Sequence, residues 1–265
     1  MIRLMKRAII YFKIIIFYLF TLIVFALASG VTKNSTNPDL FSLGLAATLT
    51  FIIAYLFTYW DKTSLTKIGI QYNQKSITEF GIGILLSVLM VMTMTALLTY
   101  FTDVTFEKSR SFNYKLLTAN IFLYFFVSCR EELAFRTYLL WRLRDNLRAW
   151  LALSIVTLVF IGEHILTGTN LKMAIFGPGL GSILFGLAFL KTKNIVLPLG
   201  LHFGWNTAHW LMGYKNNTGL FHETVPLGFE QQAESTALIA YTITMVLGIG
   251  IILLLFPQSQ NSKKI

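Results

Sequence analysis

Eight long apolar stretches constrain what this chain can fold into more than any other feature of its sequence. Each is close to the length of about 20 residues that a helix needs to cross the hydrocarbon core of a bilayer. Only 13% of the 265 residues are charged, whereas soluble domains carry about 25%. We therefore expect an all-α fold, a polytopic membrane helix bundle with about eight transmembrane helices. The stretches lie at about 8–29, 39–60, 79–101, 116–141, 149–166, 173–190, 195–213 and 236–256.

The distribution of basic residues predicts how the bundle is oriented. With eight spans, 13 of the 22 Lys and Arg residues fall in one set of loops, six fall in the other, and three lie within spans. Cytoplasmic loops are enriched in Lys and Arg, so we expect both termini to be cytoplasmic. The first stretch partly resembles a signal peptide, but its length favours a retained helix. The expected protein is integral to a membrane, and the bacterial plasma membrane is the predicted location.

Composition also excludes some classes of protein. The net charge of +10 comes from residues scattered over loops, with no separate basic face, so we expect no nucleic-acid partner. A single cysteine, Cys129, excludes an internal disulfide framework. The stretch 177–186 is rich in glycine but apolar and without a following Lys, which favours close helix packing over a phosphate loop. Ser182 within it lacks the Gly-x-Ser-Gly context of a serine intramembrane protease.

The fourth apolar stretch contains a cluster of charged side chains that would be costly in lipid without partners. Glu132 and Arg136 are four residues apart, so on a helix they share a face and can form an ion pair. Glu131 points roughly 100° away and has no such local partner. Glu131 is therefore the candidate base, and Glu132 and Arg136 are the supporting pair. The alternative is a solvated cluster at the cytoplasmic helix end, since Glu131 lies only about 16 Å of helix rise from Arg142.

Histidines occur in the fifth and seventh apolar stretches. His164 ends the fifth, where a lone histidine is more often structural than a ligand; we expect its neighbour Glu163 to point elsewhere, toward the helix terminus or a neighbouring chain. His202 and Asn206 share a face of the seventh, where they can hold a water, a metal or an oxyanion, or form interhelical hydrogen bonds. We expect His209 near the outer interface.

If these groups share one site, each should lie at a similar distance along its helix from the same side of the membrane. His202 lies about 12 Å of rise from Asn194, similar to the value for Glu131, but His164 lies about 24 Å from Arg148. A common site therefore requires the fifth helix to be tilted or to begin outside the hydrocarbon.

Three motifs in this order resemble those of the CPBP family, the CAAX-type prenyl endopeptidases and bacteriocin-processing (Abi) membrane proteases. They are Glu-Glu-x-x-x-Arg at 131–136, Phe-x-x-x-His at 160–164 and His-x-x-x-Asn at 202–206. The resemblance implies a helical bundle with a conical cavity and a catalytic set of Glu131, His164, His202 and Asn206. It also implies that Glu131 activates water. Within one integrated domain, we assign 1–114 to amino-terminal helices, 115–212 to the catalytic core, and 213–265 to a loop and the last helix.

The leading hypothesis is an intramembrane endopeptidase that hydrolyses a membrane-associated peptide or protein by Glu-activated water. A Zn²⁺ site formed by His164, His202 and Glu131, with water at the fourth position, is the metal-assisted alternative. A non-catalytic membrane immunity or regulatory protein of the same fold is the alternative outside enzymology. A proton-coupled transporter is disfavoured by the lack of repeats and helix breaks. A cysteine-protease mechanism at Cys129 is disfavoured because an apolar helical thiol is usually inert.

Overall fold

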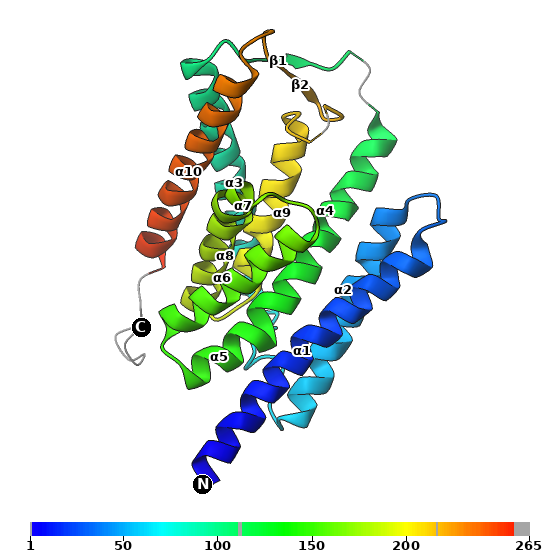
Figure 1. Ribbon diagram of the computed structural model, residues 1–265, viewed down its shortest axis with the longest axis vertical. Helices are drawn as coiled ribbons and strands as arrows, with labels where there is room; N and C mark the ends of the chain where they lie inside the picture. The colour runs from blue at the N-terminus through cyan, green and yellow to red at the C-terminus, as the bar shows by residue number, and fades with distance from the viewer. Residues whose placement is uncertain (1, 111–112, 216, 257–265) are drawn as a thin grey trace.

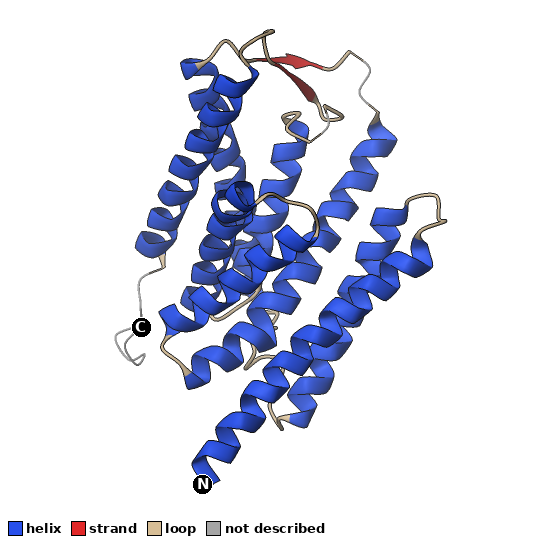
Figure 2. Ribbon diagram, viewed as in Figure 1, coloured by secondary structure: helices blue, strands red, loops and turns tan. Residues whose placement is uncertain are grey.

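The computed structural model describes residues 2–110, 113–215 and 217–256. These residues form eight continuous helical runs and one two-stranded ribbon (Figures 1 and 2). Each predicted apolar stretch is helical, so the expectation of an all-α bundle is confirmed apart from the ribbon. The runs in chain order are α1 (Ile2–Thr32), α2 (Pro38–Trp60), α3 (Gln74–Phe101), α4 (Tyr114–Ala134) continuing through η1 (Phe135–Leu140) into α5 (Trp141–Asn146), α6 (Ala149–Leu166), α7 (Leu171–Ala174) continuing through η2 (Ile175–Gly179) into α8 (Leu180–Thr192), α9 (Val196–Leu211) and α10 (Glu230–Leu255).

Six of the described runs are long and apolar enough to cross a membrane: α1, α2, α3, α6, α7 to α8, and α10. The other two predicted spans are α4, which carries several charged side chains, and α9, which has only 16 residues. Large apolar side chains are exposed over much of the outer surface, as expected for helices that face lipid. The chain is thus an integral membrane protein, and its full number of spans and its orientation stay predictions.

The fourth helical run is not straight. Thr137, within η1, has φ −73° and ψ −106°, outside the helical region, and its hydroxyl donates a hydrogen bond to the carbonyl of Leu133. A π-helical turn with such a break redirects the chain, so α5 leaves the line of α4 and leads into α6 (Figure 1). The predicted stretch 116–141 is helical throughout, but the π-helical turn within it was not predicted from the sequence.

Two large hydrophobic clusters form most of the described interior, and α8 contributes to both. A third, small cluster joins Leu98, Val104 and Ala233. One cluster joins α1, α2, η1, α5, α6 and α8, around Phe17, Phe135 and Tyr138. The other joins α3, α8, α9 and α10, around Leu197 and Leu201. The helix that holds two of the candidate residues, α9, is therefore packed on several sides.

The closest helix pair is α3 with α9, and glycine makes it possible. A Cβ at Gly200 would lie 2.4 Å from the carbonyl oxygen of Phe80, and one at Gly204 would lie 2.2 Å from Ser87 Oγ. The two residues form a Gly-x-x-x-Gly pattern, the small-residue pattern that lets membrane helices approach closely. In the stretch 177–186, where we predicted such packing, a Cβ at Gly186 would lie 2.3 Å from the side chain of Leu153, but a Cβ at Gly177 would meet nothing within 4 Å.

The ribbon lies at one end of the bundle (Figure 2). Its strands, β1 (Thr105–Lys108) and β2 (Phe221–Thr224), are antiparallel, with Thr105 opposite Thr224 and Lys108 opposite Phe221. Phe106 packs on the ring of Tyr214, just beyond α9, at 5.3 Å between centroids. The ribbon thus holds the end of α9 in place, and the sequence analysis had not predicted it.

Candidate active site

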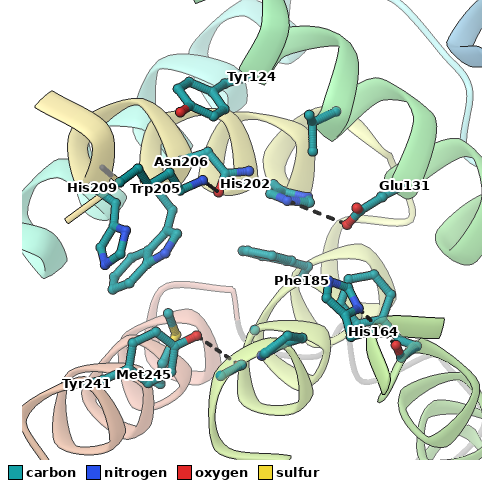
Figure 3. A pocket seen from close by; sticks show the side chains of 16 residues that line it. Tyr124, Glu131, His164, Phe185, His202, Trp205, Asn206, His209, Tyr241 and Met245 are labelled. Carbon is teal, nitrogen blue, oxygen red and sulfur yellow. Dashed lines mark hydrogen bonds and ion pairs between the residues drawn. The ribbon is translucent and has the colours of Figure 1, made fainter. Parts of the chain in front are cut away.

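A single cavity of about 320 Å³ brings together the predicted site residues. Glu131 comes from α4, His164 from α6, and His202 and Asn206 from α9 (Figure 3). The volume is in the range of small-molecule and peptide side-chain pockets. The remaining lining is largely aromatic and small: Tyr124, Val127, Phe160, Gly177, Pro178, Gly181, Phe185, Trp205, His209, Lys215, Tyr241 and Met245.

Glu132 lies behind the cavity wall, where its two oxygens have different partners. Arg136 Nε donates to Glu132 Oε2 at 3.1 Å, which is the ion pair that the four-residue spacing predicted. His202 Nδ1 lies 2.9 Å from Glu132 Oε1. Both Glu132 and Arg136 side chains are fully buried. Because a carboxylate only accepts hydrogen bonds, the Nδ1 hydrogen of His202 points at Glu132, and this fixes the ring with Nε2 toward the cavity.

Glu131 differs from Glu132 in that it faces the cavity. Its side chain is 15% exposed, and its Oε2 lies 3.7 Å from His202 Nε2 (Figure 3). The His202 ring is stacked on Phe185 at 4.7 Å and an interplanar angle of 14°. Glu131 therefore has room for a water molecule beside it and a fixed imidazole on its other side.

His164 reaches the cavity from the last turn of α6. Its Nδ1 lies 3.0 Å from the carbonyl oxygen of Phe160, one turn earlier. A carbonyl accepts, so Nδ1 carries the hydrogen and Nε2 keeps the lone pair. His164 thus lines the same cavity as Glu131 and His202, although the rise counted from Arg148 is larger for His164.

The position of α6 is fixed by a second buried ion pair. Glu163 pairs with Arg130 of α4 and accepts a hydrogen bond of 2.8 Å from the hydroxyl of Tyr18 on α1. The Arg130 side chain also lies over the ring of Phe25 at 4.5 Å. The prediction that Glu163 points toward the helix terminus or a neighbouring chain was wrong, because it bridges three helices of its own chain. Sequence spacing could not reveal a pair separated by 33 residues.

Asn206 faces the cavity one turn beyond His202. Its side-chain oxygen accepts a hydrogen bond from Lys215 Nζ at 3.0 Å. His209, one turn further, lies stacked between the rings of Trp205 and Tyr214, and its buried Nδ1 has no partner among the described residues. The sequence analysis expected His209 near the outer interface and did not consider Lys215, yet both line the cavity.

The described residues contain no group of three His, Cys, Asp or Glu side chains close enough to hold a metal ion. Glu131 and His202 are neighbours, but His164 does not complete a three-ligand set with them. The Zn²⁺ site of Glu131, His164 and His202 stays a prediction, and the mechanism proposed below uses protein groups and water.

Two other candidate nucleophiles lie away from the cavity lining. Ser182 is fully buried, receives a hydrogen bond from Arg136 Nη1 and shares one with Thr157, both at 3.3 Å. Cys129 is a free thiol that does not line the cavity. Neither is arranged as a nucleophile facing bound substrate.

The segment that supplies all four predicted catalytic residues also carries the sequence match. Residues 113–208 match the family profile described as type II CAAX prenyl endopeptidase Rce1-like. This segment is an Rce1-like domain of the CPBP/Abi family. Among curated proteins, no match to the chain was found.

A domain of this family implies intramembrane protease activity on peptide or protein substrates. The Rce1-like domain runs from the start of α4 almost to the end of α9. Lys215 and the α10 residues Tyr241 and Met245 line the same cavity from outside the domain. Part of the site is therefore built by segments that the family match does not cover.

Proposed function

We propose that this protein is an intramembrane endopeptidase in which Glu131 activates the hydrolytic water. The observation that carries the proposal is the difference between the two adjacent glutamates. Glu132 is fully buried and held by Arg136 and His202, whereas Glu131 faces the cavity beside His202. Of these two glutamates, Glu131 is therefore the one that can take a proton from a water in the cavity.

The proposed reaction begins with a water between Glu131 and His164. Glu131 accepts a proton from this water. The other O–H of the water donates a hydrogen bond to His164 Nε2, and the nascent hydroxide attacks the scissile carbonyl carbon. The carbonyl oxygen becomes an oxyanion, which accepts hydrogen bonds from the amino group of Asn206 and from the protonated form of His202. As the C–N bond breaks, Glu131 returns its proton to the leaving amine. The products are one new carboxyl and one new amino terminus.

The substrate is proposed to be a membrane-associated peptide or protein. The cavity is lined mostly by aromatic and small side chains within a bundle whose outer surface is apolar. A CAAX-type segment, with or without a prenyl group, is the substrate class that the family description suggests. A fixed Glu131 and fixed donors supply the general-base and oxyanion effects, each commonly worth about 10²-fold or more in rate.

The proposal is tested by comparing membranes that contain the wild-type protein with membranes that contain Glu131→Gln. The two variants are expressed at matched levels in a host that lacks the gene, and new peptide termini are measured by mass spectrometry. Termini that appear with wild type and disappear with Glu131→Gln support the proposal. Glu107 lies exposed on β1, so Glu107→Gln serves as the matched control and is expected to retain all of them.

The opposite result is equally informative. If wild type and Glu131→Gln give the same termini, water activation by Glu131 is wrong. If Glu131→Gln also preserves the cellular phenotype, the non-catalytic immunity or regulatory alternative replaces the enzyme.

A further inference from the structure

Lys215 is a cationic side chain in the cavity that none of the three motifs includes. It lies four residues beyond the end of α9 and outside the Rce1-like domain. Its ammonium is 3.0 Å from Asn206 Oδ1 and 4.4 Å from the centre of the Tyr124 ring. No acidic side chain among the described residues lies within 4.0 Å of it.

The backbone around Lys215 is built to return its side chain along α9. Gly213 has a φ of +94°, which an L side chain rarely adopts, and the chain reverses there. Tyr214 then fixes the turn, because its hydroxyl is hydrogen-bonded to Thr95 at 2.9 Å and its ring packs on Phe106 of β1. A lysine in a free loop would place its charge in water. Here the turn, fixed by Tyr214, directs the Lys215 side chain toward Asn206, which lies nine residues earlier in the sequence.

The hydrogen bond decides which end of the Asn206 carboxamide faces the cavity. An ammonium group has three donors and no acceptor, so the atom of Asn206 that faces Lys215 must be the oxygen. The amino group is then left for the cavity, and no described side chain or backbone group accepts a hydrogen bond from it. Without Lys215, the carboxamide could turn over and present its oxygen to the cavity. An oxygen there would repel an oxyanion, whereas an amino group stabilises it.

We propose that Lys215 is a positioning residue that holds the Asn206 carboxamide with its amino group toward the reacting carbonyl. This inference rests on the proposed function, because it assigns Asn206 as the oxyanion donor. Burial lowers the pKa of Lys215 to about 8, and the negative charge of Glu131 opposes that fall. Lys215 is thus still mostly protonated at neutral pH. Among the described residues, the other titratable side chains that line the cavity are Tyr124 and Glu131 on α4, His164 on α6, His202 and His209 on α9, and Tyr241 on α10, and Tyr214 stacks on His209.

The test is a double-mutant cycle on the purified full chain in liposomes. The probe is an internally quenched, farnesylated CAAX peptide, made with a free and with an amidated carboxyl terminus. Lys215→Met is expected to lower kcat by about 10-fold or more, since loss of a preorganised oxyanion donor costs about 10²–10³-fold. KM should change less than about 2-fold for both peptides. Lys215→Arg should restore most of kcat, because it keeps the donor and the charge.

The coupling to Asn206 distinguishes positioning from a general effect of charge. In the Asn206→Ala background, Lys215→Met should lower kcat by less than about 2-fold further, because the group that it orients is already gone. Lys108 is exposed on β1, at the same end of the bundle, and Lys108→Met should leave both constants unchanged. Additive losses in the double variant overturn the inference. A KM increase confined to the peptide with a free carboxylate also overturns it, and assigns Lys215 to substrate binding instead.

A readout independent of activity separates this inference from the proposed function. In ¹³Cε-lysine NMR spectra, the Lys215 resonance, assigned by its absence in Lys215→Met, should titrate near pH 8. It should titrate lower in Asn206→Leu, which removes the acceptor. If the probe is not cleaved but this shift is seen, the positioning contact stands and the proposed endopeptidase fails for this substrate. If Lys215 titrates identically in wild type and Asn206→Leu, the positioning contact is wrong.

Discussion

The buried pair of Glu132 and Arg136 offers the sharpest test of how this bundle tolerates charge. We consider Glu132→Leu, which removes the carboxylate and leaves Arg136 in place. Both side chains are fully buried. Arg136 would keep only its 3.3 Å hydrogen bond to Ser182, and its Nη2 already has no partner. Breaking a buried pair from one side typically costs about 3–5 kcal/mol, because an uncompensated charge is left in a low-dielectric interior. We expect a loss of this size.

The paired substitution should behave differently. Glu132→Leu together with Arg136→Met removes both charges and replaces them with apolar side chains of similar length. Such replacements are often neutral or stabilising, so the double variant should recover most of the stability that the single variant loses. It should still be inactive, because His202 Nδ1 has lost the carboxylate that fixes its ring.

Unfolding in mixed micelles, followed by circular dichroism as the denaturing detergent is increased, gives the stability of each variant. Lys75 and Glu79 provide a matched control with the same four-residue spacing, in which the lysine is 76% exposed and the pair is 3.5 Å apart. Lys75→Met should change stability by less than about 1 kcal/mol. The reasoning is refuted if Glu132→Leu costs no more than this control, or if the double variant is as unstable as the single one.

Two further predictions concern helix packing and metal dependence. Gly200→Ala should destabilise the bundle by about 1–3 kcal/mol, since the added Cβ would lie 2.4 Å from the carbonyl oxygen of Phe80. Gly250→Ala, which has open space around it, should be neutral or slightly stabilising in the same mixed-micelle unfolding assay; equal losses for both would contradict the packing argument. Dialysis against EDTA should leave the cleavage rate within about 2-fold, measured with any substrate found by the termini comparison. Loss of activity that returns on adding Zn²⁺ would instead support the metal-assisted alternative.

The sequence predicted those features that depend on neighbours along one helix. Apolar length located all eight helical runs, and the four-residue spacing predicted the ion pair of Glu132 with Arg136. It also predicted that Glu131 faces a different direction, which the structure bears out as exposure to the cavity. These inferences hold because the side-chain directions of a helix follow from its own geometry.

Contacts between helices were beyond such reasoning. Glu132 and His202 are 70 residues apart, and Arg130 and Glu163 are 33 apart. Nothing in the spacing of a single helix states which partner a buried charge has on another. The Arg130–Glu163 pair could nevertheless have been predicted from charge. Glu163 lies in an apolar stretch and requires a cationic partner there, and Arg130 was among the few available. The kink at Thr137 was also missed, because neither Pro nor Gly marks it in the sequence.

The buried charges together explain why one glutamate is free to react. Among the described residues, Arg130 is paired with Glu163, and Arg136 is paired with Glu132. Each arginine therefore neutralises one carboxylate. The Arg130–Glu163 pair also links α4 to α6, and the Arg136–Glu132 pair lies within one helical run. Glu131 is left without an arginine, beside an imidazole whose other nitrogen is already held by Glu132. A carboxylate in an ion pair with arginine would be a poor proton acceptor, because the guanidinium stabilises its charged form. In the proposed mechanism the two arginine pairs thus act indirectly: they neutralise the neighbouring acids and leave Glu131 to exchange a proton with water in the cavity.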